Sequence, residues 1–222
     1  MTMRMVVGVN KMNNISIIQN TYDLLAQNYN EHFKDEHYKK PKDLEVLLKF
    51  AKLVKNKNNI WDIGCGSGHT TKYLFDLGVN ISGLDLSFSM INIAQKQYKD
   101  IHFQQGDILN LDFKENSIDA IISFYSIVHF SNEQVEIAFK GIYKILKSNG
   151  LFLFSFHVGE NTIHLNKFLN KNIDIDFMFF NIDFITAILK KTGYKDIEII
   201  QREPYNQDIE YQSKRCYIFC KK

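Results

Sequence analysis

The chain has 222 residues, 45% of them hydrophobic, which is enough for one domain to bury a full core. Lysine and arginine total 27 against 25 acidic residues, which gives a formal net charge of +2. A balance this even argues against nucleic acid or an anionic membrane as a partner. The three cysteines form no C-x-x-C pair, which indicates a reduced, cytoplasmic chain.

The N-terminal segment carries only a short apolar patch, too short for a signal peptide or a membrane span. Residues 1–14 are therefore expected to form a disordered extension, followed by a single domain over 15–222.

Two helices are expected before the first strand. Helical periodicity over 15–33 places Tyr22 and Tyr29 on one face. Pro41 suits the first turn of a second helix that runs to about Val54. This second helix is expected to pack on the sheet.

A glycine-rich stretch then joins a short apolar strand over 59–63, which contains Asp62, to a helix over 70–77. Its three alternating glycines are Gly64, Gly66 and Gly68. Glycine removes the side chain where the backbone must turn sharply and approach a ligand, and the helix directs its amide groups at that ligand. The stretch therefore suits an adenine-containing cofactor with an anionic group.

The spacing of the glycines distinguishes among cofactors. A dinucleotide fingerprint reads G-x-G-x-x-G, whereas the third glycine comes one residue early in this chain. A second strand over 81–86 carries Asp85, whose carboxylate can accept both hydroxyls of a ribose. The run D-I-G-C-G-S-G followed by G-L-D-L-S resembles class I S-adenosylmethionine-dependent methyltransferases.

Strands and helices continue to alternate along the rest of the chain, with Ser87 and Ser131 as expected helix N-caps. The expected later elements are a helix from Ser87 to about Tyr98, strands at 101–105, 116–123 and 151–156, helices at 132–146 and 183–192, and a closing antiparallel pair at 196–202 and 215–220. This alternation requires an α/β fold with a parallel sheet covered on both faces. The resemblance implies a Rossmann-like, doubly wound, seven-stranded mixed sheet in three α/β/α layers, with strand order 3-2-1-4-5-7-6 and the last strand antiparallel.

The resemblance also implies a set of cofactor-binding residues. In it, Asp107 accepts a hydrogen bond from the exocyclic amine of adenine, Ile108 packs on the ring, and Tyr22 and Tyr29 lie near the methionine moiety or the substrate. Met90 suits the core as well as a cofactor contact. The full set is Tyr22, Tyr29, Asp62, Gly64, Cys65, Gly66, Gly68, Asp85, Leu86, Met90, Asp107, Ile108, Ser123 and Phe124.

Methyl transfer is an in-line displacement at a sulfonium carbon, and a base is needed only if the nucleophile arrives protonated. His129 and His157 each follow a central strand, and an ordinary histidine pKa suits proton transfer near neutrality. Tyr125 is a third catalytic candidate, able to orient a substrate hydroxyl or amine. Arg202 and Arg215 are candidates to receive a substrate carboxylate. No histidine has a metal-site spacing, so no metal site is expected.

Residues 157–180 follow neither the helical nor the strand period well and are expected to form a substrate lid, as residues 15–40 are expected to form a helical cap. The resulting hypothesis is a cytoplasmic methyltransferase, monomeric or homodimeric, acting on O, N or S of a small metabolite. A non-catalytic S-adenosylmethionine-binding module and an NAD-dependent oxidoreductase remain alternatives. A nucleic-acid methyltransferase fits less well, because no acid–amide motif follows the fourth strand.

Overall fold

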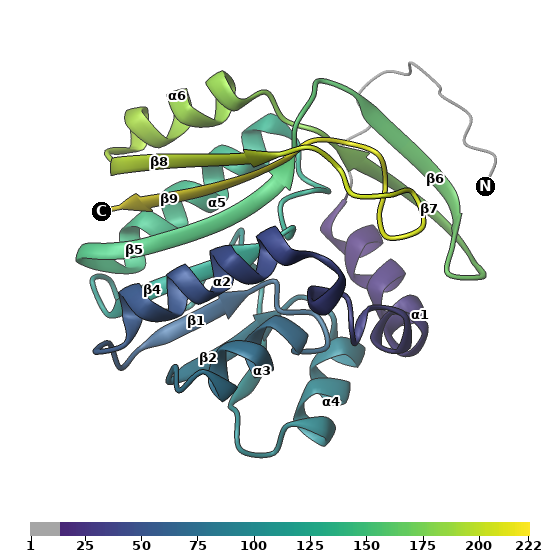
Figure 1. Cartoon of the computed structure of the whole chain (residues 1–222), viewed down its shortest axis with the longest axis horizontal. Helices are drawn as coiled ribbons and strands as arrows, with labels where there is room; N and C mark the ends of the chain where they lie inside the picture. The colour runs from purple at the N-terminus through teal and green to yellow at the C-terminus, as the bar shows by residue number, and fades with distance from the viewer. Residues whose placement is uncertain (1–13) are drawn as a thin grey trace.

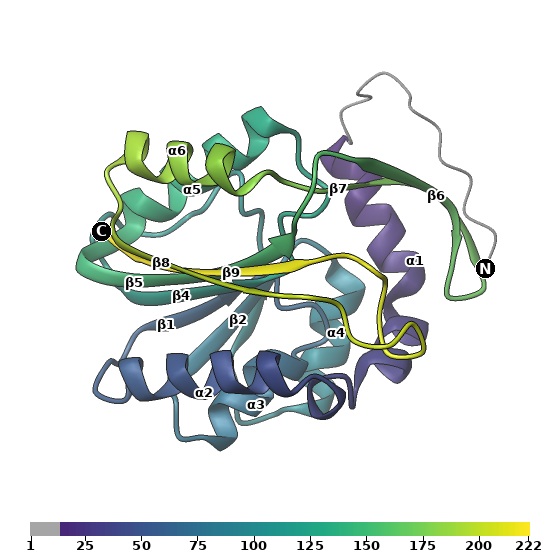
Figure 2. The same ribbon diagram turned by 45° about the horizontal axis from the view of Figure 1, so that its top comes forward.

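The computed structural model of the protein describes residues 14–222, so the extension predicted for residues 1–14 lies outside the described part except for its last residue. The body of the molecule is one seven-stranded sheet with helices on both faces (Figures 1 and 2). Its strands are β1 Ile60–Ile63, β2 Ile81–Asp85, β3 Phe103–Gln105, β4 Ile118–Phe124, β5 Leu146–His157, β8 Lys195–Arg202 and β9 Arg215–Lys221.

The strand order is β3-β2-β1-β4-β5-β9-β8. Neighbours from β3 to β5 pair in parallel, whereas β9 runs antiparallel to both β5 and β8. Because β6 and β7 form a separate hairpin, this order is the predicted 3-2-1-4-5-7-6 with two strands added to the count. The predicted α/β fold is thereby confirmed.

Helices cover the two faces of the sheet separately. In Figure 2, α2 and α3 lie below the sheet, and α5 and α6 lie above it. The helices are α1 Ile15–Phe33, α2 Pro41–Val54, α3 His69–Asp76, α4 Phe88–Gln97, α5 Asn132–Ile145 and α6 Ile182–Thr192, with a short 3-10 helix η1 at His37–Lys39. Ser87 and Ser131 cap α4 and α5 as predicted, because each hydroxyl accepts a hydrogen bond from a first-turn amide.

The central strands are buried on both faces, as expected for a parallel sheet between helices. Along β5, Phe152, Phe154 and Phe156 contribute to the core beneath α5 and α6. Alternate residues of the same strand, such as Leu153, point to the opposite face and join the core between the sheet and α2, which includes Phe50. Cys216 and Cys220 are both buried and free on β9.

Residues 157–180 are more regular than their sequence suggested. Strand β6, Thr162–Phe168, pairs antiparallel with β7, Lys171–Met178. Leu169 and Asn170 between them both have positive φ, which matches a two-residue hairpin turn. The hairpin lies beside α1 in both views, and the Asn28 side chain donates a hydrogen bond to the Leu169 carbonyl at 2.9 Å (Figures 1 and 2).

Among the described residues, no helix is both long enough and apolar enough to span a membrane.

Candidate active site

Two adjoining hollows lie where β1, β2 and β4 end. The first has a volume of about 730 Å³ and the second about 600 Å³, open mouths included. Both are lined by Tyr29, Gly64, Gly66, Phe124 and Tyr125. The carboxyl ends of strands in an open α/β sheet are the usual place for ligands, so the topology directs attention to this edge.

The glycine-rich loop separates β1 from α3 and forms part of both hollows. Gly64 has φ of +81°, and a Cβ there would lie 2.3 Å from Cβ of Ser126, so no other residue fits. Gly68 has φ of +87°, and its Cβ would lie 2.9 Å from the ring of Phe103. Gly68 is not among the residues that line either hollow, so packing accounts for this third glycine.

Asp85, the last residue of β2, faces the first hollow. One carboxylate oxygen accepts the amide of Gly66 at 2.8 Å, and the other accepts the amide of Ser87, also at 2.8 Å. Burial raises the pKa of Asp85 to about 6, although the two amide bonds act in the opposite direction. Each oxygen retains a further acceptor position, so this carboxylate can receive hydroxyl groups from a ligand.

The rest of the first hollow combines one more acid with apolar walls. Asp107 follows β3 and lines the hollow, and its carboxylate accepts the amide of Leu109 at 2.8 Å. The apolar side chains Leu86, Met90 and Ile108 line the same space. Acids at the ends of successive strands, with apolar residues between them, suit a nucleoside that has both a polar edge and a flat ring.

Three other residues of the predicted cofactor set, Asp62, Cys65 and Ser123, do not line the first hollow. Asp62 and Cys65 line the second hollow, where the Asp62 carboxylate accepts the hydroxyl of Thr71 at 2.7 Å. Burial raises the pKa of Asp62 to about 7 despite that bond. Ser123 is fully buried, donates to the Ile63 carbonyl at 2.8 Å, and is not among the lining residues of either hollow.

Tyr22 and His129 form a hydrogen-bonded pair in the first hollow, 2.7 Å apart from hydroxyl oxygen to Nε2. The Nδ1 atom of His129 lies 2.8 Å from the backbone carbonyl of Asp176 on β7. A carbonyl only accepts, so Nδ1 carries the proton and Nε2 accepts from the phenol. Burial lowers the pKa of His129 to about 4, so the imidazole is neutral near pH 7.

The rings of Tyr125 and His157 are in contact, with centroids 5.5 Å apart. Tyr125 has φ of +53°, an uncommon conformation for a bulky residue, and its hydroxyl lies 3.3 Å from that of Tyr217. His157 hydrogen-bonds the Ser213 hydroxyl at 2.8 Å, and burial lowers its pKa to about 3. His157 contacts Tyr125 but is not among the residues that line either hollow.

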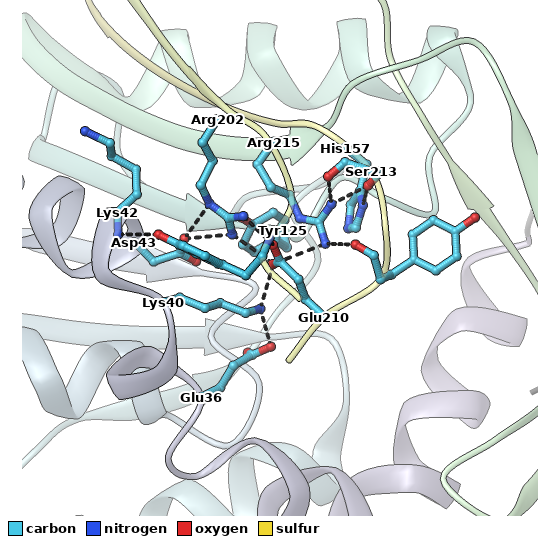
Figure 3. Close-up of polar contacts among 12 residues, drawn as sticks. Glu36, Lys40, Lys42, Asp43, Tyr125, His157, Arg202, Glu210, Ser213 and Arg215 are labelled. Carbon is cyan, nitrogen blue, oxygen red and sulfur yellow. Dashed lines mark hydrogen bonds and ion pairs between the residues drawn. The ribbon is translucent and has the colours of Figure 1, made fainter. Parts of the chain in front are cut away.

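Arg202 and Arg215 belong to a buried ion network beside the second hollow (Figure 3). Arg202 donates to Asp43 at 3.0 Å and to Glu210 at 2.9 Å, and Arg215 lies 3.3 Å from Glu210. All four side chains are at most 6% exposed. The structure thus corrects the expectation of a substrate carboxylate at these arginines, because the chain supplies the carboxylates itself.

Lys40 extends this network toward α1. Its ammonium lies 2.5 Å from the carboxylate of Glu36 and 3.4 Å from that of Glu210 (Figure 3). Nothing in the local sequence pairs the segment before α2 with the loop between β8 and β9, so this network could not be predicted. The network links the loop between β8 and β9 to the start of α2.

The second hollow also holds polar residues that the sequence analysis did not select. They are Glu36, His37, Asp43, Ser67, His69 and Thr70. Ser67 lies within the glycine loop, and His69 and Thr70 follow it directly, so proximity to the loop is the sequence signal for these three residues. Among the described residues, no group of three or more histidine, cysteine or acidic side chains could hold a metal ion.

Comparison with known proteins bears on this geometry. A family described as the methyltransferase domain matches residues 61–154, from β1 to the middle of β5. This match assigns residues 61–154 to the methyltransferase domain family, and the chain is similar to class I S-adenosylmethionine-dependent methyltransferases. The matched region contains the glycine loop, Asp85, Asp107 and strand β4. The first three of these features line the first hollow, and β4 ends beside it.

Two curated proteins illustrate how far the likeness of this chain to known methyltransferases and related enzymes extends. It is 25% identical over 173 residues to an uncharacterized methyltransferase of Oceanobacillus iheyensis, covering 78% of this chain and 73% of that one. It is 32% identical over 162 residues to a carboxy-S-adenosyl-L-methionine synthase of a Nitratiruptor species, covering 68% and 61%. The alignment thus spans less than two thirds of the synthase's own length.

A solved structure supports the fold of the chain. Phosphoethanolamine N-methyltransferase 2 of Haemonchus contortus, in complex with S-adenosyl-L-methionine, superposes with a TM-score of 0.61 at 18% identity. The superposition covers 80% of this chain and 52% of the nematode enzyme. At this identity the likeness establishes the fold alone.

Proposed function

We propose that the protein transfers the methyl group of S-adenosylmethionine to O, N or S of a small metabolite, with the cofactor in the first hollow. The observation that carries this proposal is the placement of Asp85 beside the glycine loop, with both carboxylate oxygens fixed by loop amides. The match of residues 61–154 to the methyltransferase domain family supports the same reaction.

The residues present fit this cofactor. Asp85 would accept the ribose hydroxyls, and Asp107 with Ile108 would hold the adenine. Tyr22 and Tyr29 would cover the methionine part, since both line the first hollow from α1. The further members of the predicted cofactor set that line the hollows are Gly64, Cys65, Gly66, Leu86, Met90 and Phe124, together with Asp62. The cofactor, when bound, supplies an electrophilic methyl group on a sulfonium sulfur.

The chain's own residues then have two tasks. The first is to hold the acceptor in line with the methyl group and to exclude water, for which α1 lines the first hollow and the β6–β7 hairpin packs against α1. The second is to receive the acceptor's proton. Tyr22 can take that proton while its own proton passes to Nε2 of His129, which the Asp176 carbonyl keeps in the accepting tautomer.

The domain division follows from this proposal. Residues 15–222 would act as one methyltransferase domain, with residues 15–40 as a cap over the cofactor and 157–180 as a lid over the acceptor. A small-molecule acceptor, a monomeric or homodimeric state and a cytoplasmic location stay predictions of the sequence.

The substitution Asp85→Asn tests the cofactor assignment. We expect it to weaken the binding of S-adenosylhomocysteine by roughly 100-fold, because it removes charge-assisted hydrogen bonds and turns one acceptor into a donor that faces a loop amide. Asp76→Asn is the matched control, since Asp76 lies exposed on α3 and pairs with Lys72. Calorimetric titration measures both affinities. A dissociation constant for Asp85→Asn within twofold of the unmodified protein would refute the assignment.

A further inference from the structure

Two backbone groups of strand β7 hold the segment that carries His129. The amide of Met178 donates to the Val128 carbonyl at 2.7 Å, and the carbonyl of Asp176 lies 2.8 Å from Nδ1 of His129. Val128 and His129 lie between β4 and α5, in a part of the chain without regular structure of its own. The hairpin therefore fixes this segment at two adjacent residues.

Phe177 lies between these two backbone contacts, and its side chain touches the same histidine. The rings of Phe177 and His129 lie 4.4 Å apart between centroids, with an interplanar angle of 70°. Aromatic rings favour this T-shaped arrangement over a face-to-face stack. His129 is only 3% exposed, so the contact is part of a closely packed environment. A packed ring has little room to rotate.

The same hairpin is held by α1, the helix that carries Tyr22. The ring of Phe168 on β6 lies 6.4 Å from that of Phe33 on α1 and 6.4 Å from that of Phe177. A hydrogen bond from α1 reaches the hairpin turn, and the hairpin lies beside α1 in both views (Figures 1 and 2). The hairpin thus contacts both elements that supply the Tyr22–His129 pair.

The orientation of the His129 ring decides whether the pair can pass a proton. A neutral imidazole carries its proton on either ring nitrogen, and only the nitrogen without the proton accepts a hydrogen bond. The Tyr22 hydroxyl faces Nε2 at 2.7 Å, so Nε2 must be the free nitrogen and Nδ1 the protonated one. A rotated imidazole would lose both hydrogen bonds at once.

We propose that Phe177 is a positioning residue that holds the His129 ring with Nδ1 toward the Asp176 carbonyl and Nε2 toward Tyr22. This inference rests on the proposed function and adds to it a residue from outside the cofactor site. Phe177 is not among the residues that line either hollow, so it acts through His129 and not through the cofactor.

The tautomer of His129 tests the proposal without any need for activity. Heteronuclear NMR on protein labelled at its histidine ring nitrogens distinguishes a protonated from an unprotonated nitrogen, and His129→Ala identifies the signals. The unmodified protein is expected to show His129 protonated at Nδ1 alone. Phe177→Ala should lose this single form and show both tautomers. A single Nδ1-protonated form in Phe177→Ala would overturn the proposal.

Phe179→Ala is the matched control, because it makes the same change two residues further on. The Phe179 ring stacks on His157 at 5.2 Å between centroids, and its loss should leave the single His129 tautomer in place. Two tautomers in Phe179→Ala would show a general loosening of the segment and contradict a specific role for Phe177. If Phe177→Ala does not fold, Phe177→Leu carries the test, and a single tautomer there overturns the proposal.

The rate of methyl transfer provides a second readout. Phe177→Ala should slow the release of S-adenosylhomocysteine in a deproteinised metabolite extract by roughly 10- to 100-fold, because a displaced proton acceptor is a poor one. Its affinity for S-adenosylhomocysteine should stay within twofold of that of the unmodified protein. In the His129→Ala background, Phe177→Ala should cause no further loss, because Phe177 acts through that ring.

These readouts separate the positioning role from the proposed function. A loss of S-adenosylhomocysteine affinity as large as the loss of rate, or a full further loss in the His129→Ala background, would contradict the positioning role. If the unmodified protein does not bind S-adenosylhomocysteine at all, the proposed function is wrong. The tautomer comparison would still decide whether Phe177 orients His129.

Discussion

Replacing Arg202 with methionine is expected to lower the free energy of unfolding by about 3–5 kcal/mol, because it leaves buried charges uncompensated. Arg202 donates to Asp43 and Glu210, and Nε also donates to the Tyr217 hydroxyl at 2.8 Å. All of these groups are buried, so water cannot replace the lost bonds. Urea denaturation followed by circular dichroism measures the loss.

Lys214→Met is the control for this prediction. Lys214 pairs with Glu203 at the surface, where both side chains are more than half exposed, so its loss should cost less than about 1 kcal/mol. Equal stability of the Arg202→Met and Lys214→Met variants would show that the network contributes little. Arg202→Lys keeps the charge but loses the bidentate contact, so its loss in the free energy of unfolding should lie between those of Arg202→Met and Lys214→Met.

The pH dependence of stability offers a second readout for the same network. Burial alone would raise the pKa of Glu210, but the hydrogen bond from Arg202 and other contacts lower it to about 2. Since this pKa lies below the ordinary value, the native state is stabilised above pH 4.5, and that contribution disappears as the pH falls toward 2. Arg202→Met should lose this acid dependence.

Replacing His129 with alanine is expected to lower the rate of methyl transfer by about 100- to 1,000-fold with little change in cofactor affinity. His129 accepts the proton of Tyr22 and is itself held by the Asp176 carbonyl, so its removal leaves the phenol without a proton acceptor at Nε2. Release of S-adenosylhomocysteine in the presence of a deproteinised metabolite extract measures the rate.

Tyr22→Phe and the double variant complete the test of the pair. Because the two residues act as one unit, the double variant should be little slower than His129→Ala alone. His102→Ala, an exposed histidine at the start of β3, is the control and should retain full activity. A fall in S-adenosylhomocysteine affinity as large as the fall in rate would instead make His129 a structural residue of the first hollow.

The sequence was informative where function or folding depends on neighbours in the chain. The glycine loop, the acid at the end of β2 and the serine caps of α4 and α5 each depend on a few consecutive residues, and the fold followed from the alternation of strand and helix. Even the helix boundaries lay within a residue or two, as for α3, which starts at His69 instead of residue 70.

Long-range pairing was beyond the reach of local patterns. Arg202 contacts Asp43, 159 residues away in the chain, and this distance hid the carboxylate partner that the arginine already has. The β6–β7 hairpin was missed for another reason. Its second strand does alternate, with Ile173, Ile175 and Phe177 apolar. In the first strand the alternation of Ile163 and Leu165 stops at the irregularity between Leu165 and Lys167.

The residues of the candidate site also divide into those with a local sequence signal and those without one. Asp85 could be selected because it follows the glycine loop at a recognisable spacing. Phe177 could not, because its contact with a distant histidine is visible only in the packed structure. Ser123 was selected at the end of a predicted strand and His157 just after one. Ser123 donates to the Ile63 carbonyl and His157 hydrogen-bonds Ser213, so neither side chain lines a hollow.

The most direct measurement is a calorimetric titration of the unmodified protein with S-adenosylhomocysteine and, separately, with NADH. The glycine spacing, Asp85 and the first hollow predict that S-adenosylhomocysteine binds with one site per chain and that NADH does not bind. Binding of NADH alone would contradict the account and favour an oxidoreductase.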